Sequence, residues 1–332
     1  MTVMPTFQLI RATSIADVIA ARRAHPGCKL LAGGTGLVTN LRQGLNATEA
    51  LVDITGIREL QEISASPIEF RIGATVTLKC LAADPRIRQT LPALADAAET
   101  VAGPTHRASA TVGGNLCLDT RCVFYNQSEW WRRSNDFCLK YAGATCHVAP
   151  TGKRCHAAYS GDLAPLLLVL QTTAELAGES GTRAVPIQDL FQEDGAAHLR
   201  LQADEMLTAV RVPIRPDLAA KYEKVRYRGA IDFPLAGVAV GLRRTGDQLA
   251  ELRIALTGTN SRPLLLSGCE PLVGRPLDAG ALKQIDKLVQ HQVSPMRTTA
   301  VPAQYRRRVA AALACRVARK LFAGAGGTEK AD

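Results

Sequence analysis

The sequence of 332 residues lacks the features that define several protein classes. No apolar run approaches the length of a membrane span, and residues 1–9 show no basic stretch followed by an apolar one. No nucleic-acid recognition motif accompanies the net charge of +10. We therefore expect a cytoplasmic globular protein that binds neither nucleic acid nor a membrane.

Two common binding motifs are also missing. No G-x-G-x-x-G stretch follows a strand pattern, so a Rossmann dinucleotide fold is not indicated. No paired C-x2–4-C knuckles occur, although structural zinc sites usually show them. The glycines and cysteines that are present must therefore be interpreted from their own spacing.

Four of the nine cysteines fall within one stretch of 34 residues, with the spacing C-x15-C-x7-C-x8-C. Disulfides are disfavoured in the cytoplasm, and soft sulfur ligands select zinc or an iron–sulfur cluster. The wide, irregular spacing favours a cluster over a zinc staple, which remains the alternative. The four candidate ligands are Cys122, Cys138, Cys146 and Cys155, and His147 or His156 could replace one of them.

The other five cysteines are interpreted separately. Cys28, Cys80, Cys269 and Cys315 are isolated, and we expect each to be a small buried apolar residue. Cys117 precedes Cys122 by only five residues, so it is either a fifth candidate ligand or a buried thiol.

The cysteine segment is locally basic, with six basic residues against two acids over residues 121–159. This balance favours a docking face for an acidic electron-carrier protein, and an ordinary solvated surface is the alternative. The charged residues are Arg121, Arg132, Arg133, Lys140, Lys153, Arg154, Glu129 and Asp136.

Two glycine-rich stretches indicate a nucleotide cofactor. Gly33–Gly36 lies between an apolar strand pattern at 29–32 and a helix pattern from residue 37, and Thr111–Asn115 forms a second turn. Such turns present backbone N–H groups to phosphate oxygens, and a helix N-terminus favours their negative charge. Two such turns in one domain could hold the two ends of a dinucleotide pyrophosphate.

The pattern of elements predicts an α+β protein of two domains. Ser14 followed by Asp17 predicts a capped helix over 14–24, and short strands and helices alternate up to residue 212. Pro213 and Pro216 interrupt that pattern, so a boundary is expected after residue 216. The remainder predicts a three-stranded antiparallel sheet, two helices and a frayed tail, with strands at 221–228, 237–243 and 249–256, helices at 278–291 and 304–322, and the tail at 323–332.

The glycine-rich stretches carry a family resemblance that covers essentially the whole chain. Residues 30–37 (LLAGGTGL) and 111–116 (TVGGNL) resemble the FAD-binding loops of the medium subunits of molybdenum hydroxylases, the xanthine dehydrogenase and carbon monoxide dehydrogenase family. The resemblance implies a two-part FAD-binding domain of the vanillyl-alcohol-oxidase type over 1–216 and a small C-terminal domain over 217–332. It implies FAD contacts from Leu31, Ala32, Gly33, Gly34, Thr35, Gly36, Leu37, Ala110, Thr111, Gly113, Gly114, Asn115, Asp162, Leu207 and Lys224.

The cysteine segment resembles one particular group within this family. Residues 113–122 (GGNLCLDTRC), 125–132 (YNQSEWWR) and 137–141 (FCLKY) resemble the flavin-carrying subunits of 4-hydroxybenzoyl-CoA reductases. In those subunits an insertion, here residues 119–160, carries an additional [4Fe–4S] cluster. The resemblance implies that its ligands here are Cys122, Cys138, Cys146 and Cys155.

The resemblance also implies partners and a function. A large subunit would hold the molybdenum cofactor and a small subunit the [2Fe–2S] centres, in a dimer of heterotrimers with ferredoxin as electron donor. Electrons would pass through [4Fe–4S] and FAD to the partners, where 4-hydroxybenzoyl-CoA would be dehydroxylated to benzoyl-CoA in anaerobic aromatic degradation. This chain would contribute no catalytic residue. Asp162 would meet the ribityl or ribose part of FAD, Lys224 would lie near the isoalloxazine ring, and Phe233 or a neighbour would pack against the flavin.

Two alternatives remain. The first is the flavin and [4Fe–4S] subunit of an aldehyde-oxidising molybdenum hydroxylase, which would use the same cofactors with electrons flowing outward. The second is an FAD-binding or nucleotide-binding protein whose cysteine segment is a zinc staple.

Overall fold

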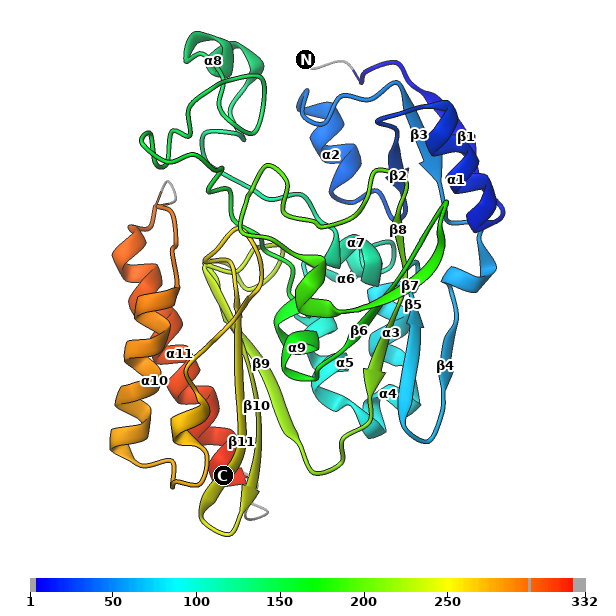
Figure 1. Ribbon diagram of the computed structural model, residues 1–332. Helices are drawn as coiled ribbons and strands as arrows, with labels where there is room; N and C mark the ends of the chain where they lie inside the picture. The colour runs from blue at the N-terminus through cyan, green and yellow to red at the C-terminus, as the bar shows by residue number, and fades with distance from the viewer. Residues whose placement is uncertain (1–3, 298–299, 325–332) are drawn as a thin grey trace.

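Three separate sheets organise the chain in the computed structural model, which describes residues 4–297 and 300–324 (Figure 1). The N-terminal sheet is parallel, with strand order β1-β3-β2, and its helices follow the first and second strands. The elements are β1 (Gln8–Arg11), α1 (Ile15–Ala24), β2 (Lys29–Leu31), α2 (Leu37–Arg42) and β3 (Ala50–Asp53).

The predicted cap of the first helix is confirmed. The Ser14 hydroxyl accepts a hydrogen bond from the Asp17 amide at 3.1 Å, and the Asp17 carboxylate accepts one from the Ser14 amide at 3.0 Å. This reciprocal pair satisfies backbone donors that the helix itself leaves unpaired. The helix ends at Ala24, with His25 as its C-cap.

The second sheet is antiparallel, with strand order β4-β5-β8-β6-β7. Its strands are β4 (Ile63–Ala65), β5 (Glu69–Gly73), β6 (Thr173–Gly178), β7 (Gly181–Pro186) and β8 (Met206–Pro213). The helices between β5 and β6 are α3 (Leu78–Ala83), α4 (Pro85–Thr90), α5 (Pro92–Glu99), α6 (Pro104–Arg107), α7 (Val112–Leu116), α8 (Glu129–Ser134) and α9 (Leu163–Val169), and short 3-10 turns lie at Arg58–Leu60, Ile187–Leu190 and Glu270–Leu272.

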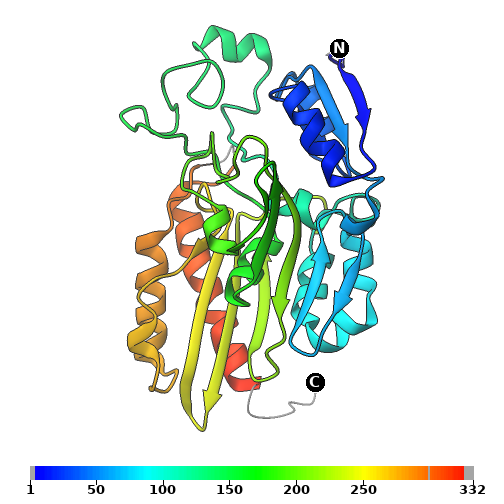
Figure 2. The ribbon, with the colours of Figure 1, turned by 45° about the vertical axis from the view of Figure 1, so that its right-hand side comes forward.

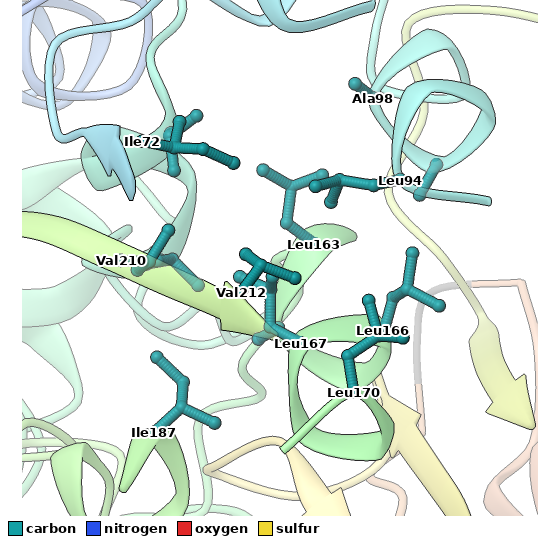
Figure 3. Packing of buried hydrophobic residues seen from close by; sticks show 14 of the residues in the cluster. Ile72, Leu94, Ala98, Leu163, Leu166, Leu167, Leu170, Ile187, Val210 and Val212 are labelled. Carbon is teal, nitrogen blue, oxygen red and sulfur yellow. The ribbon is translucent and has the colours of Figure 1, made fainter. Parts of the chain in front are cut away.

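Helix α9 occupies the centre of the largest apolar core (Figure 3). In this close-up Leu163 of the helix lies beside Leu94 of α5, and Leu167 lies beside Val212 of β8. Every residue of α9 is buried, which explains why its sequence is continuously apolar. The helix begins directly after Asp162, so its packing also fixes that carboxylate.

The C-terminal sheet has four strands, so the expectation of three strands was wrong. Its antiparallel order is β12-β11-β10-β9, and the added strand contains only two residues that pair with the end of β11. A segment this short carries no alternating pattern from which a strand could be predicted. The elements are β9 (Ala219–Val225), β10 (Ala236–Thr245), β11 (Gln248–Thr257), β12 (Leu264–Leu265), α10 (Ala279–Gln292) and α11 (Ala303–Gly324).

Helices α10 and α11 lie together beside this sheet (Figure 1). The hairpin turn between β10 and β11 contains Gly246, whose φ is +58°. Arg306 near the start of α11 is buried. Its guanidinium donates to the carbonyl of Met296 at 2.7 Å and that of Leu235 at 3.0 Å, and also to that of Gly258. One cation thereby fixes three loops of the domain. Residues 325–332 of the expected tail lie outside the described residues.

The segment 119–160 forms a lobe that stands apart from the sheets and carries α8 (Figures 1 and 2). Both views place it at the same end of the molecule as the N-terminal sheet and its helices. We call residues 119–160 the cysteine lobe. Within the described part of the chain, no helix is both long and apolar enough to cross a bilayer.

Candidate functional site: two glycine loops and a four-cysteine cavity

The first glycine loop connects β2 to α2 at the edge of the parallel sheet. Gly34 has a φ of +69°, a backbone conformation that favours glycine. Thr35 and Gly36 are exposed, whereas Leu31, Ala32, Gly33 and Leu37 are half-buried. Gly36 is the N-cap of α2, and a Cβ placed there would meet no heavy atom within 4 Å. The loop therefore presents bare backbone and a helix N-terminus to an open space, as a phosphate site requires.

The second glycine stretch is the first turn of a helix and not the turn that the sequence predicted. Thr111 caps α7 by accepting a hydrogen bond from the Gly114 amide at 3.0 Å. Gly113 packs so closely against Ala74 that an added Cβ would lie 2.9 Å from the Ala74 carbonyl oxygen and Cβ. The Ala110 carbonyl accepts a hydrogen bond from the Leu78 amide at 2.8 Å. The stretch is thus held firmly against β5 and α3.

The two glycine loops touch each other. A Cβ added to Gly33 would lie 1.8 Å from the carbonyl oxygen of Ser109 and 3.0 Å from the amide nitrogen of Ala110. Only a glycine permits this approach, because the obstructing atoms are backbone atoms that cannot rotate away. The structure therefore brings together the two stretches that the sequence assigned to one nucleotide.

A buried ion pair lies below the second loop. The Lys224 ammonium donates to both Asp162 carboxylate oxygens, at 3.0 and 3.1 Å, and the Tyr222 hydroxyl donates to the same carboxylate at 2.6 Å. Burial raises the pKa of Asp162, while Lys224 and the hydrogen bond from Tyr222 oppose that rise. Burial lowers the pKa of Lys224, whereas the negative charge of Asp162 and its hydrogen bond raise it.

Asn115 connects this pair to the second loop. Its side-chain oxygen accepts a hydrogen bond from the Leu163 amide at 3.0 Å, one residue beyond Asp162. Leu207 is 5% exposed and packs into the main core from β8. The roles of Asp162, Lys224 and Leu207 toward FAD stay predictions. Phe233, expected to pack against the flavin, is 56% exposed.

The four cysteines of the cysteine lobe line one cavity. Cys122, Cys138, Cys146 and Cys155 line one small hollow that is partly open to solvent. Cys122, Cys146 and Cys155 are buried, and Cys138 is half-buried. The remaining walls are mostly aromatic or apolar, and comprise Phe124, Tyr125, Leu139, Lys140, His147 and Val148. Among the described side chains, no three His, Cys, Asp or Glu residues form a group suited to a metal ion.

Backbone amides point at two of the cavity sulfurs. The Ala157 amide donates to the Cys155 Sγ at 3.3 Å, and hydrogen bonds from the amides of Phe124 and Tyr125 lower the pKa of Cys122. Burial outweighs these contacts, raising the pKa of Cys155 to about 11 and also raising that of Cys122. The thiols of Cys122 and Cys155 are therefore protonated at neutral pH, and a metal bound by them would have to displace their protons.

The other five cysteines and the two candidate histidines differ in burial and in whether they line the cavity. Cys117 is half-buried against the main core and does not line the cavity, and desolvation raises its pKa to about 12. Cys28 and Cys269 are buried as expected and Cys315 is half-buried, but Cys80 is exposed, so that expectation was wrong. His147 lines the cavity and contacts the Phe137 carbonyl oxygen at 2.5 Å, whereas His156 does not line it.

The count of basic residues overstated the positive surface of the cysteine lobe. Arg132 is 2% exposed, with its guanidinium 4.9 Å from the ring centre of Tyr141. The side chain of Lys140 is 5% exposed. Of the six basic residues, only Arg133 and Lys153 are exposed, and Arg133 pairs with Glu129 at 2.8 Å. Sequence spacing could not reveal this, because the Gly44 carbonyl that accepts from Arg132 and the Gly195 carbonyl that accepts from Lys140 come from distant parts of the chain.

Comparisons with known proteins agree with this geometry. The family described as "FAD binding domain in molybdopterin dehydrogenase" matches residues 5–215, and the "CO dehydrogenase flavoprotein C-terminal domain" matches residues 220–321. The chain is 29% identical over 321 residues to the putative xanthine dehydrogenase FAD-binding subunit XdhB of Escherichia coli (strain K12), covering 96% of each protein. It is 30% identical over 272 residues to the aldehyde oxidoreductase FAD-binding subunit PaoB of the same organism, covering 78% of this chain and 83% of PaoB.

Solved structures extend the similarity to the whole fold. A chain in the structure of reconstituted CO dehydrogenase from Oligotropha carboxidovorans superposes with a TM-score of 0.80 at 26% identity, covering 97% of this chain and 99% of that one. The chain belongs to the FAD-binding medium subunits of the xanthine dehydrogenase and CO dehydrogenase family of molybdenum hydroxylases.

Proposed function

We propose that this chain is the electron-transfer subunit of a 4-hydroxybenzoyl-CoA reductase and holds a [4Fe–4S] cluster in addition to FAD. One observation carries the proposal: four cysteines spread over 34 residues converge on one cavity within a lobe of their own. Convergent thiols without disulfides are the donor set of iron–sulfur clusters.

The cavity suits a cluster in three respects. It offers four cysteine sulfurs around one hollow. Amides at Phe124, Tyr125 and Ala157 donate toward cavity sulfurs, a contact that stabilises thiolates and raises cluster potentials. Phe124, Tyr125 and Val148 limit access of water. A cluster bound there would supply one-electron transfer.

The flavin side of the proposal rests on the two glycine loops and the buried pair. Gly33 to Leu37 and Thr111 to Asn115 would hold the FAD pyrophosphate through their backbone amides and the N-terminus of α2. Lys224 would favour reduced, anionic flavin through its positive charge, with Asp162 holding the ammonium in place. The finer assignment of Asp162 to the ribityl or ribose part belongs to this proposal.

In the proposed direction, a reduced ferredoxin docks on the cysteine lobe of a cytoplasmic complex. Electrons reach the [2Fe–2S] and molybdenum centres of partner subunits, in a dimer of heterotrimers. There, 4-hydroxybenzoyl-CoA takes up two electrons and two protons to give benzoyl-CoA and water. This chain contributes no group to that chemistry; its residues bind and orient the carriers.

The test is turnover by the complex of this chain with its co-expressed partner chains under anaerobic conditions. Reduced ferredoxin and 4-hydroxybenzoyl-CoA should yield benzoyl-CoA, detected by mass spectrometry. A complex that holds all of its cofactors but gives no benzoyl-CoA would refute the substrate assignment.

A second candidate is the flavin and [4Fe–4S] subunit of an aldehyde-oxidising enzyme. The 30% identity with an aldehyde oxidoreductase FAD-binding subunit favours it. The same complex would then oxidise an aromatic aldehyde to its acid and deliver two electrons to an acceptor. Turnover of the aldehyde, without turnover of the thioester, would select this alternative.

A further inference from the structure

Lys140 forms part of the wall of the four-cysteine cavity, and its charge is held in place. Its ammonium donates to the Thr120 hydroxyl at 2.6 Å, to the Asp119 carboxylate at 2.7 Å and to the Gly195 carbonyl at 2.7 Å. Three acceptors use all three N–H groups of a lysine. With its side chain only 5% exposed, Lys140 is a fixed positive charge.

The environment of this charge has little water to screen it. The ammonium lies 5.1 Å from the ring centre of Tyr125, which also lines the cavity and is 2% exposed. Charges in partly buried surroundings interact several times more strongly than the same charges in water. A surface lysine such as Lys153, on the same lobe, lacks this setting.

Asp119 connects the pair to the FAD-binding domain. Its second carboxylate oxygen accepts hydrogen bonds from the side-chain amide of Asn46 at 3.1 Å and from the side-chain amide of Asn40 at 3.5 Å. Asn40 belongs to α2, the helix that follows the first glycine loop. The Lys140–Asp119 pair therefore joins the cavity wall to the element that presents the nucleotide loop.

We propose that the Lys140–Asp119 pair sets the reduction potential of the [4Fe–4S] cluster, an inference that rests on the proposed function. Reduction adds one electron and changes no covalent bond, so the cavity gains one negative charge. Lys140 stabilises that charge and raises the potential, while Asp119 attenuates the effect. The two residues act on the cluster through their fixed charges and contact no substrate.

The test removes the positive charge of the pair in one variant and its negative charge in another. In the complex with the partner chains, Lys140→Met leaves Asp119 uncompensated and should lower the cluster's potential. Asp119→Asn leaves Lys140 uncompensated and should raise it. The double variant should lie between the two, and the exposed control Lys153→Met, which removes the same charge, should leave the potential unchanged.

Potentials are measured by anaerobic redox titration followed by EPR, with iron and acid-labile sulfide determined for each variant. We expect about a tenfold change in the equilibrium constant for one-electron reduction in each single variant, which is about 59 mV. Shifts of one common sign, or shifts no larger than that of Lys153→Met, would overturn the inference.

The iron content of the complex distinguishes a failure of this inference from a failure of the proposed function. A wild-type complex without the additional four irons overturns both. Four irons with unshifted potentials overturn only the role of the pair. If Lys140→Met binds no cluster, Asp119→Asn decides alone, because a rise in potential supports the inference and an unchanged or lower potential overturns it.

Discussion

Replacing Gly33 by alanine should separate the two glycine loops and release FAD. The added Cβ would lie 1.8 Å from the Ser109 carbonyl oxygen and 2.5 Å from its carbon. The backbone would have to retreat by about 1.6 Å to reach an ordinary contact of 3.4 Å. Overpacking of this kind costs about 1–3 kcal/mol. This strain destabilises the loop conformation that binds the nucleotide. Since about 1.4 kcal/mol corresponds to a factor of ten in the dissociation constant, FAD affinity should fall about tenfold to a hundredfold.

Gly324→Ala is the matched control. It adds the same methyl group at the end of α11, outside both glycine loops, where nothing lies within 4 Å of the added Cβ. Flavin per chain would be measured after purification, and the dissociation constant after stripping and titrating FAD back into each protein. Gly33→Ala should lose flavin while Gly324→Ala retains it. Full flavin occupancy and unchanged affinity in Gly33→Ala would refute the inference that close contact between the loops shapes the site.

Two further predictions concern buried charges. Lys224→Met leaves the Asp162 carboxylate buried without its cation and should lower the free energy of unfolding, measured by urea titration, by about 3–5 kcal/mol. The control Lys221→Met, on the exposed side of the same strand, should lower it by less than about 1 kcal/mol. Equal losses in the two variants would contradict the account of a buried pair. Burial, together with the nearby charge of Lys140, lowers the pKa of His198 to about 4 from 6.5. The unfolded chain therefore binds more protons between these values, so stability is complete above pH 6.5 and falls by about 3 kcal/mol toward pH 4. His198→Gln should flatten that part of the unfolding free energy's pH profile, and an unchanged slope would count against the assignment.

Local signals in the sequence predicted most of the elements around the site. The Ser14–Asp17 pair marked the start of a helix, because this signal lies within a few neighbouring residues. The turn at Gly33 was also identified, because a glycine-rich stretch between a strand pattern and a helix pattern indicates a turn.

Long-range pairing lay beyond the sequence. Lys140 was counted as surface charge because its partners, Asp119 and the Gly195 carbonyl, lie about twenty and more than fifty residues away. The same applies to the approach of Gly33 to Ser109 and to the pairing of Lys224 with Asp162. Spacing identified the groups that carry chemistry, and only the fold showed which of them face one another.

The most direct test of the account is the metal and flavin content of the complex, purified anaerobically with its partner chains. The account predicts one FAD and four irons with matching sulfide beyond those of the partners' [2Fe–2S] centres, an additional EPR signal on reduction, and loss of that signal with retention of FAD in Cys138→Ser. The exposed Cys80→Ser serves as control and should retain both. Zinc in place of iron, or an unchanged iron content in Cys138→Ser, would contradict it.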